Sequence, residues 1–353
     1  MSTLGKLPRL EGECPFGSQR TAPVARLDGE PRLAGRHATG SRVSRADEAR
    51  ARWRGVLTPL VTPFGEDGSL DLASLASNLR WLLDRGADET NTVLLAAGSG
   101  GDFTSMSLAE RQDVIRIVAE VNQRRIPLIA GVQSLDVREC IALCQFCEQL
   151  GVDAVQISGP FYYDGRPDDV VAWMKQVARH TSIGFAIYNN WYTGYNMPLD
   201  LVDALLDLPN TMAIKWSAPT IEAFMAGVRR FLPRVAVVNN TFNTVTGHLL
   251  GCRVFVSHWA NFFPEFPWRV QQLMDSGCYQ EAQRHLDRLM VPYERLVAQI
   301  ANQTAGEGVF VRPLMAEVGL RGGCSRLPSR DEVVTTAMRQ GFRDLLDLAR
   351  ASH

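Results

Sequence analysis

Long apolar runs are missing from this sequence of 353 residues. No stretch approaches the roughly 18–20 apolar residues of a membrane-spanning helix, and the N-terminus lacks the apolar core of a secretory signal. Charge of one sign is not in excess either, since 37 Lys and Arg residues are matched by 38 Asp and Glu residues. A net charge near zero gives no electrostatic footprint for nucleic acid or a membrane surface. We therefore expect a cytoplasmic protein that binds neither.

A disulfide framework is also absent. The seven cysteines are an odd set scattered over a large chain, which favours reduced thiols. Cys140, Cys144 and Cys147 have the C-x3-C-x2-C spacing of the radical S-adenosylmethionine enzymes, so an iron–sulfur radical enzyme is one alternative. However, they fall in an amphipathic stretch, 137–150, whereas a cluster needs thiolates that converge from an open loop. A buried helix face is the better interpretation.

The first 52 residues differ from the rest in composition. They are rich in Arg, Gly, Pro and Ser and contain no periodic apolar stretch, so we expect residues 1–52 to be a disordered extension. Their acidic residues argue against an organelle-targeting peptide, which should be poor in acids.

From residue 53 onward, apolar strand-like runs alternate with amphipathic helix-like stretches. The runs lie at 55–63, 92–97, 127–132, 154–158, 184–189, 212–216, 235–239 and 252–257. Eight such units in about 210 residues predict an α/β fold of the (β/α)8 TIM-barrel type. An open doubly wound sheet would need a Gly-rich phosphate turn after the first strand, and that turn here reads TPFGEDGSLD. We place the barrel at 53–265 and a C-terminal helical appendage at 266–353.

Lys215 is the leading catalytic candidate. Catalytic groups of such barrels lie at the C-terminal ends of the strands, and Lys215 ends the apolar sixth run. Desolvation lowers the pKa of a lysine and makes its amine nucleophilic. A lysine that extends to the rim of the barrel, or pairs with a carboxylate, is the alternative.

Two further strand ends support this interpretation. Tyr188 ends the adjacent fifth run, where its phenol could transfer protons beside the amine; the alternative is a packed barrel residue. The turn Gly98–Gly101 supplies free backbone N–H groups that suit a carboxylate, although glycines also simply relax tight turns. His248 and His258 have no partner at metal-ligand spacing, so no metal site is expected.

Aromatic residues gather near the predicted mouth of the barrel. They are Phe103, Trp191, Tyr192, Trp216 and Trp259. Such a wall suits a substrate larger or less polar than a sugar acid; the alternative is that these rings only pack the barrel.

These residues occur within a set of ordered motifs. The chain reads TPLVTPFGEDGSLD at 58–71, GSGGD at 98–102, PFY at 160–162, YN at 188–189 and IK at 214–215. A segment from Gly251 through Ser257 to Ala260-Asn261 follows. In this order they resemble the dihydrodipicolinate synthase and N-acetylneuraminate lyase superfamily of Schiff-base-forming aldolases and dehydratases. The resemblance extends from Gly55 to about Pro328.

The resemblance implies roles for individual residues. Lys215 would form an imine with a 2-oxo acid such as pyruvate, so no external cofactor would be needed. Tyr188 would shuttle protons, Ser99 would relay them, and Tyr162 would complete the relay near a neighbouring subunit's site. The substrate-binding residues would be Gly98, Gly100, Gly101, Tyr192, Trp191, Trp216 and Ser257. The family also implies a homo-oligomer, a dimer or tetramer.

The departures from the family pattern limit the activity. The synthase branch carries an arginine after Tyr-Asn that grips the second substrate, and the run NWYTG at 190–194 lacks it. Gly100 replaces a threonine of the carboxylate site. We therefore expect a lyase other than the synthase, either an aldolase or a dehydratase. A non-catalytic or repurposed barrel of the same family is the alternative.

Overall fold

The computed structural model describes residues 44–162, 165–192 and 195–352. Residues Val43–His353 form one compact unit. Most of the extension predicted at 1–52 therefore lies outside the described residues.

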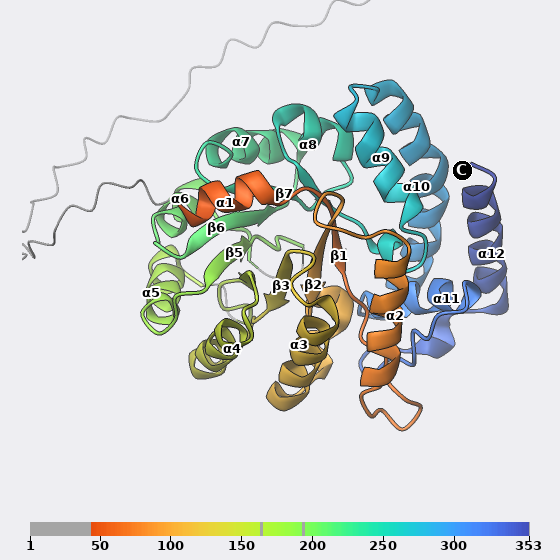
Figure 1. The fold of residues 1–353 in the computed structure, drawn as a ribbon, viewed down its shortest axis with the longest axis horizontal. Coiled ribbons are helices and arrows are strands. Elements are labelled where there is room, and N and C mark those ends of the chain that lie inside the picture. The colour runs from red at the N-terminus through yellow and green to blue at the C-terminus, as the bar shows by residue number, and fades with distance from the viewer. Residues whose placement is uncertain (1–43, 163–164, 193–194, 353) are drawn as a thin grey trace, which may run out of the picture. The chain divides into compact units, whose positions relative to one another are not determined.

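Eight parallel strands close into a barrel in chain order (Figure 1). They are β1 Gly55–Pro59, β2 Thr92–Ala96, β3 Leu128–Gly131, β4 Ala154–Ile157, β5 Gly184–Tyr188, β6 Thr211–Trp216, β7 Ala236–Asn239 and β8 Val254–Val256. Each of the eight predicted runs contains one of these strands or, for β6, all but its first residue. The predicted (β/α)8 barrel is confirmed.

Helices follow the strands and surround the barrel (Figure 1). The seven between strands β1 and β8 are α2 Leu72–Asp84, α3 Leu108–Asn122, α4 Val137–Leu150, α5 Pro167–Ala178, α6 Leu199–Leu206, α7 Ile221–Phe231 and α8 Thr244–Leu250. Short polar side chains fix where several of them begin. Ser107, for example, forms a capping box with Glu110 at the start of α3.

Strand alternation divides the core into two parts. Small and aliphatic side chains such as Leu95, Ala186 and Ala213 fill the inside of the barrel. Their neighbours along each strand, such as Ile187 and Ile214, pack outward against the helices. Successive residues of a strand point to opposite faces, so this pattern decides which side chains at the strand ends reach the site.

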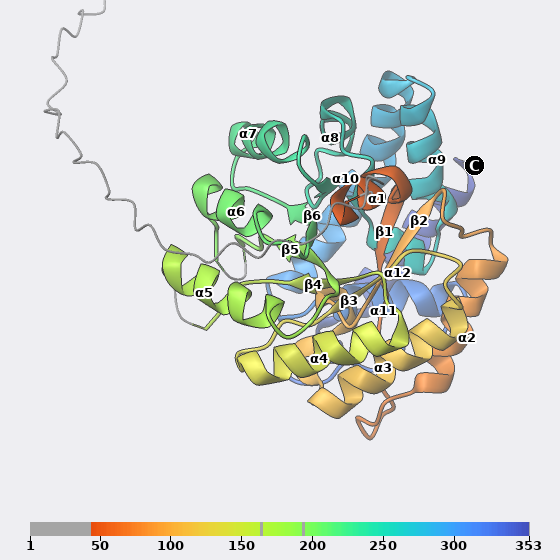
Figure 2. The same ribbon diagram turned by 60° about the vertical axis from the view of Figure 1, so that its left-hand side comes forward.

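Residues 45–52 correct one expectation. They form a helix, α1 Arg45–Arg52, where disorder was predicted. Its buried Ala49 and the following Trp53 belong to the apolar cluster inside the barrel. Figure 2 shows α1 beside the strands near one end of the barrel. Helix α1 therefore closes this end, and the barrel unit begins before residue 53.

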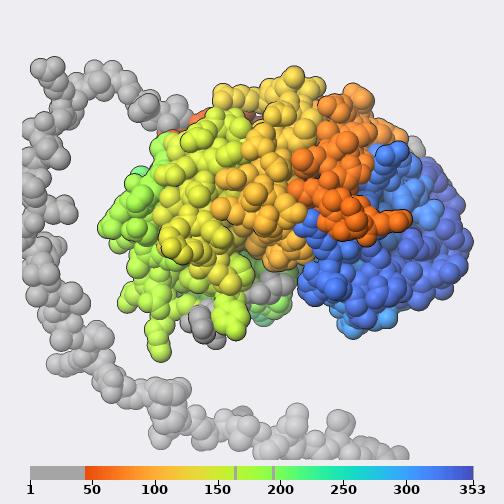
Figure 3. Space-filling view, turned by 90° about the horizontal axis from the view of Figure 1, so that it is seen from below, coloured from red at the N-terminus to blue at the C-terminus, as the bar shows by residue number. Residues whose placement is uncertain are grey.

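The C-terminal helices belong to the same compact unit, so the predicted division at residue 265 marks no separate domain. They are α9 Glu265–Asp275, α10 Tyr279–Ala301, α11 Gly308–Glu317 and α12 Thr336–Arg350. Figure 3 shows this blue segment packed directly against the orange N-terminal part of the barrel. The amide of Asn78 on α2 donates to the carbonyl of Arg321, 2.8 Å away.

Arg312 of α11 fastens these helices to the barrel mouth. Its guanidinium is buried and forms a salt bridge with Asp102, which follows strand β2. It also donates to the carbonyl oxygens of Thr62 at 2.9 Å and Gly322 at 3.1 Å. Burial raises the pKa of Asp102, and the Arg312 charge opposes that rise. Removing either partner would leave an uncompensated buried charge, so this pair holds the start of α11 at the mouth.

The role of α1 as the closure of the barrel can be tested at Trp53. Replacing Trp53 with alanine should lower the free energy of unfolding by about 3–5 kcal/mol, because a large buried ring leaves a cavity. The matched control is Arg54→Ala, an exposed neighbour for which a change within about 0.5 kcal/mol is expected. Chemical denaturation measures both; equal effects of the two substitutions would contradict the role of α1.

Candidate active site

Lys215 and Tyr188 lie side by side at the ends of neighbouring strands. They are register partners in the pairing of β6 with β5, as are Ala213 and Ala186 before them. The alternation therefore points both side chains inward at the mouth. Lys215 is 5% exposed, and its Nζ lies 4.2 Å from the centroid of the Tyr188 ring.

The surroundings of the Lys215 amine favour its neutral form. Burial lowers the pKa of Lys215 to about 8, and the negative charge of Glu307 opposes that change. Desolvation penalises the ammonium because the low-dielectric interior does not replace its water. With a pKa near 8, about a tenth of the amine is neutral and nucleophilic at pH 7.

Tyr188 belongs to a short chain of polar side chains. Its hydroxyl lies 3.1 Å from that of Tyr192, and the amide of Asn240 donates to the Tyr192 hydroxyl over 3.3 Å. Burial, followed by the charges of Tyr192 and Glu307, holds the pKa of Tyr188 well above its usual value. Its phenol therefore stays protonated and acts as a hydrogen-bond or proton donor.

The glycine-rich turn after β2 presents unused donors. Residues Ser99–Gly101 form a short 3-10 helix, and no described residue accepts a hydrogen bond from the N–H of Ser99 or Gly100. Ser99 lines a cavity. Gly98 and Gly101 lie so close to neighbouring groups that neither position has room for a side chain. A Cβ added at Gly98 would lie 2.8 Å from Leu95, and one at Gly101 would lie 2.8 Å from the carbonyl oxygen of Leu60. The turn thus offers a cradle for an anionic group.

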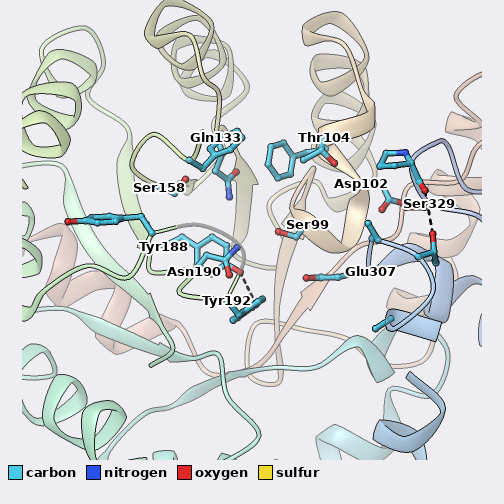
Figure 4. Close-up of a pocket in the computed structure, with 18 of the residues that line it drawn as sticks. Ser99, Asp102, Thr104, Gln133, Ser158, Tyr188, Asn190, Tyr192, Glu307 and Ser329 are labelled. Atoms are coloured by element: carbon cyan, nitrogen blue, oxygen red, sulfur yellow. Dashed lines mark hydrogen bonds between the residues drawn. The ribbon is translucent and has the colours of Figure 1, made fainter. Parts of the chain in front are cut away.

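A cavity of about 480 Å³ joins these elements. Its lining includes Ser99 and Asp102 from the turn after β2, Tyr188 and Tyr192 from β5 and the turn that follows it, and Glu307 from the start of α11. Figure 4 shows these five side chains around the same space. Lys215 is not among the lining residues, but the ring of Tyr188, which does line the cavity, lies against its amine.

A second cavity of about 590 Å³ lies next to the first. Tyr192, Glu307 and Phe310 line both cavities. The second is largely apolar and aromatic; its other lining residues include Trp191, Phe242, Ser257, Trp259, Phe266, Met290 and Tyr293. The predicted substrate-binding residues Trp191 and Ser257 therefore face this second cavity.

The expectation that Trp216 stands at the mouth is wrong. Because Trp216 directly follows the inward-pointing Lys215, its side chain points outward. Its indole packs edge-on against Phe231 of α7 and donates to the carbonyl of Phe224 over 3.1 Å. Trp216 belongs to the layer between barrel and helices and lines neither cavity.

Tyr162 lies apart from the other predicted catalytic residues. Its side chain is 74% exposed and lines neither of the two cavities. Its predicted part in the proton relay, beside a neighbouring subunit's site, stays a prediction.

Glu307 was not anticipated from the sequence. It precedes helix α11, and its side chain makes no hydrogen bond that caps this helix. Oε2 lies 3.4 Å from Nε2 of His258, at the end of β8. Burial alone would raise the pKa of Glu307, but the His258 ring and the Lys215 charge lower it overall. A carboxylate thus reaches the site from a segment far along the chain, with no strand-end signal to predict it.

The three closely spaced cysteines lie on one helix, α4, and are buried. Burial raises the pKa of Cys147 to about 12, so its thiol stays protonated rather than forming the thiolate that ligates metals. The described residues contain no group of three or more His, Cys, Asp or Glu side chains arranged to hold a metal ion. No helix among them is long and apolar enough to cross a membrane.

The structure is a (β/α)8 barrel with a lysine–tyrosine pair at its mouth, and comparison with known proteins identifies the family. The model of the dihydrodipicolinate synthetase family matches residues 52–347. This chain belongs to that family, whose members are lyases of the class I aldolase type.

Individual relatives are distant. The chain is 28% identical over 279 residues to 4-hydroxy-tetrahydrodipicolinate synthase of Archaeoglobus fulgidus, covering 78% of this chain and 92% of that protein. It is 27% identical over 298 residues to N-acetylneuraminate lyase of Rhizobium meliloti, covering 83% and 95%. The crystal structure of dihydrodipicolinate synthase from Oceanobacillus iheyensis has a TM-score of 0.75 at 21% identity, covering 86% and 99%. That last similarity shows the fold alone.

The lowered pKa of Lys215 predicts unusual reactivity near neutrality. The rate at which acetic anhydride modifies Lys215 should reach half its maximum near pH 8. Only the neutral amine reacts, and burial lets the neutral form appear at a lower pH than in a solvent-exposed lysine. Peptide mass spectrometry measures the labelling, with N-α-acetyl-lysine added as an internal reference amine. Parallel titration of Lys215 and the reference amine would contradict the desolvated environment.

Proposed function

We propose that this protein forms an imine between Lys215 and a 2-oxo acid and then breaks a carbon–carbon or carbon–oxygen bond of that substrate. The observation that carries the proposal is the buried amine of Lys215 against the Tyr188 ring, at the C-terminal end of a barrel strand. The lowered pKa of the amine favours nucleophilic attack on a carbonyl carbon. Family membership supports the same chemistry.

The residues suit successive steps of this reaction. The free N–H groups of Ser99 and Gly100 would bind the substrate carboxylate, which places the adjacent carbonyl carbon toward Lys215. Tyr188 would donate a proton to the oxygen that leaves as water when the imine forms. The covalent imine then accepts electrons from the bond that breaks, so the lysine performs the work of a cofactor. An aldolase and a dehydratase share this imine and its enamine.

The second cavity supports a substrate with a bulky or aromatic portion. Its aromatic lining adjoins the first cavity through Tyr192, Glu307 and Phe310. Apolar rings favour burial of an apolar group. The part of the substrate beyond the 2-oxo acid would lie against this lining.

A homo-oligomer is part of the proposal. Tyr162 is a large, exposed side chain beside the turn after β4, and such residues are enriched at interfaces between proteins. In a dimer or tetramer, Tyr162 would approach the site of a neighbouring copy.

Reductive trapping tests the imine directly. The protein has three lysines in all, Lys6, Lys175 and Lys215, so an adduct is readily assigned. Incubation with borohydride and pyruvate, 2-oxobutanoate or aryl-substituted 2-oxo acids should add one reduced substrate to the peptide that contains Lys215. The aryl-substituted acids should compete with pyruvate for this adduct.

Two control variants show whether the trapped adduct forms at Lys215 or at any lysine. Lys215→Met should give no adduct, whereas Lys175→Arg, a change at an exposed helix position, should leave the yield unchanged. Absence of a Lys215 adduct with every acid would refute the proposal and favour a non-catalytic barrel.

A further inference from the structure

Glu307 and His258 form a pair of ionisable side chains in the wall between the two cavities. Glu307 lines both cavities, and His258 lines the second. Their side chains approach to 3.4 Å, and 28% of the Glu307 side-chain surface remains accessible. Because Glu307 lines both cavities, its side chain can contact a molecule bound in either of them.

The imidazole of His258 is held in one place. It packs edge-on against Phe310, with ring centroids 5.8 Å apart at 83°. On another side lies Gly100, where an added Cβ would be 3.0 Å from Cε1 of His258 and 2.9 Å from Pro59. The absence of a side chain at Gly100 therefore makes room for the ring beside the N–H groups that would hold the substrate carboxylate.

The surroundings of His258 also favour one tautomer. Nδ1 is buried and has no hydrogen-bond partner among the described residues. A proton on Nδ1 would be a buried donor without an acceptor, whereas a proton on Nε2 has the Glu307 carboxylate nearby. The proton is therefore better placed on Nε2, where it points toward Glu307 and keeps the carboxylate oriented.

We propose that Glu307 is the base that removes a C3 proton from the imine formed at Lys215, with His258 as its positioning residue. This assignment rests on the proposed function. In the step, the C3–H bond breaks and its electrons form a C2=C3 bond. The C=N electrons move to nitrogen, and the proton is transferred to Glu307. The reverse transfer returns a proton to C3.

Electrostatics favour Glu307 over Tyr188 for this role. The pKa of Tyr188 is held well above its usual value by burial, then by Tyr192 and Glu307, so its phenol is not a base near neutrality. Despite burial, the pKa of Glu307 is lowered by His258 and Lys215, so its carboxylate is ionised. Enamine formation removes the positive charge of the iminium, which raises the proton affinity of Glu307 as the proton arrives.

Deuterium exchange tests the assignment without knowledge of the natural substrate. Pyruvate or 2-oxobutanoate, whichever traps better at Lys215, is incubated with the intact protein in D2O, and loss of C3 protons is followed by NMR. Glu307→Gln should slow exchange about 100-fold or more, as expected for loss of a general base, while borohydride trapping at Lys215 persists. His258→Gln, whose amide can still donate to the carboxylate, should retain more exchange than His258→Ala.

Control variants and the trapping result distinguish failure of the proposed function from failure of the role assigned to Glu307. Glu332→Gln, an exposed site outside both cavities, should match the wild type, and Lys215→Met gives the background exchange. No trapping in the wild type refutes the proposed function itself. Wild-type trapping without exchange, or exchange in Glu307→Gln within about threefold of the wild type, overturns only the role of Glu307.

A third variant resolves the case in which Glu307→Gln also fails to trap. Glu307→Asp keeps the charge but shortens the side chain. Reduced exchange with trapping retained supports the assignment. An equal fall in both overturns it, because a structural defect lowers the two together.

Discussion

The buried amine of Lys215 is the constraint on which the rest of the site depends. An ammonium at this position loses its water, and the neighbouring strands offer it an aromatic face rather than a directly bonded carboxylate. Its pKa consequently falls, and the barrel carries a group that is costly to bury but reactive toward carbonyl carbons. The proposed roles of three other features depend on this amine: Tyr188, the free N–H groups after β2 and the nearby cavity.

The barrel alone does not complete the site. Its only described acidic partner for the Lys215 charge is Glu307, which lies just before α11. The buried pair of Arg312 and Asp102 fastens that helix to the loop after β2, so the C-terminal helices contribute to the chemistry as well as to the core. The ion pair of Arg312 and Asp102 thus links the turn after β2, which carries the free N–H groups, to the helix that Glu307 precedes.

Local patterns in the sequence were sufficient to predict much of this structure. The eight strands could be predicted because apolar runs alternate regularly with amphipathic helices, and Lys215 because a charge at the end of such a run is unusual. The outward position of Trp216 was also accessible in principle, since it follows from strand alternation. Helix α1 was missed because its residues are almost all polar or small and only Ala49 is buried within it. Glu307 could not be predicted, because its position depends on how helices remote in sequence fold back onto the barrel mouth.

The central claim is that Lys215 forms the imine within the constellation of Ser99, Tyr188 and Glu307. A crystal structure of the protein soaked with pyruvate tests it most directly. The account predicts continuous electron density from Nζ of Lys215 to C2 of pyruvate, with the pyruvate carboxylate on the N–H groups of Ser99 and Gly100. Pyruvate bound elsewhere, or held in the site without a bond to Lys215, would contradict it.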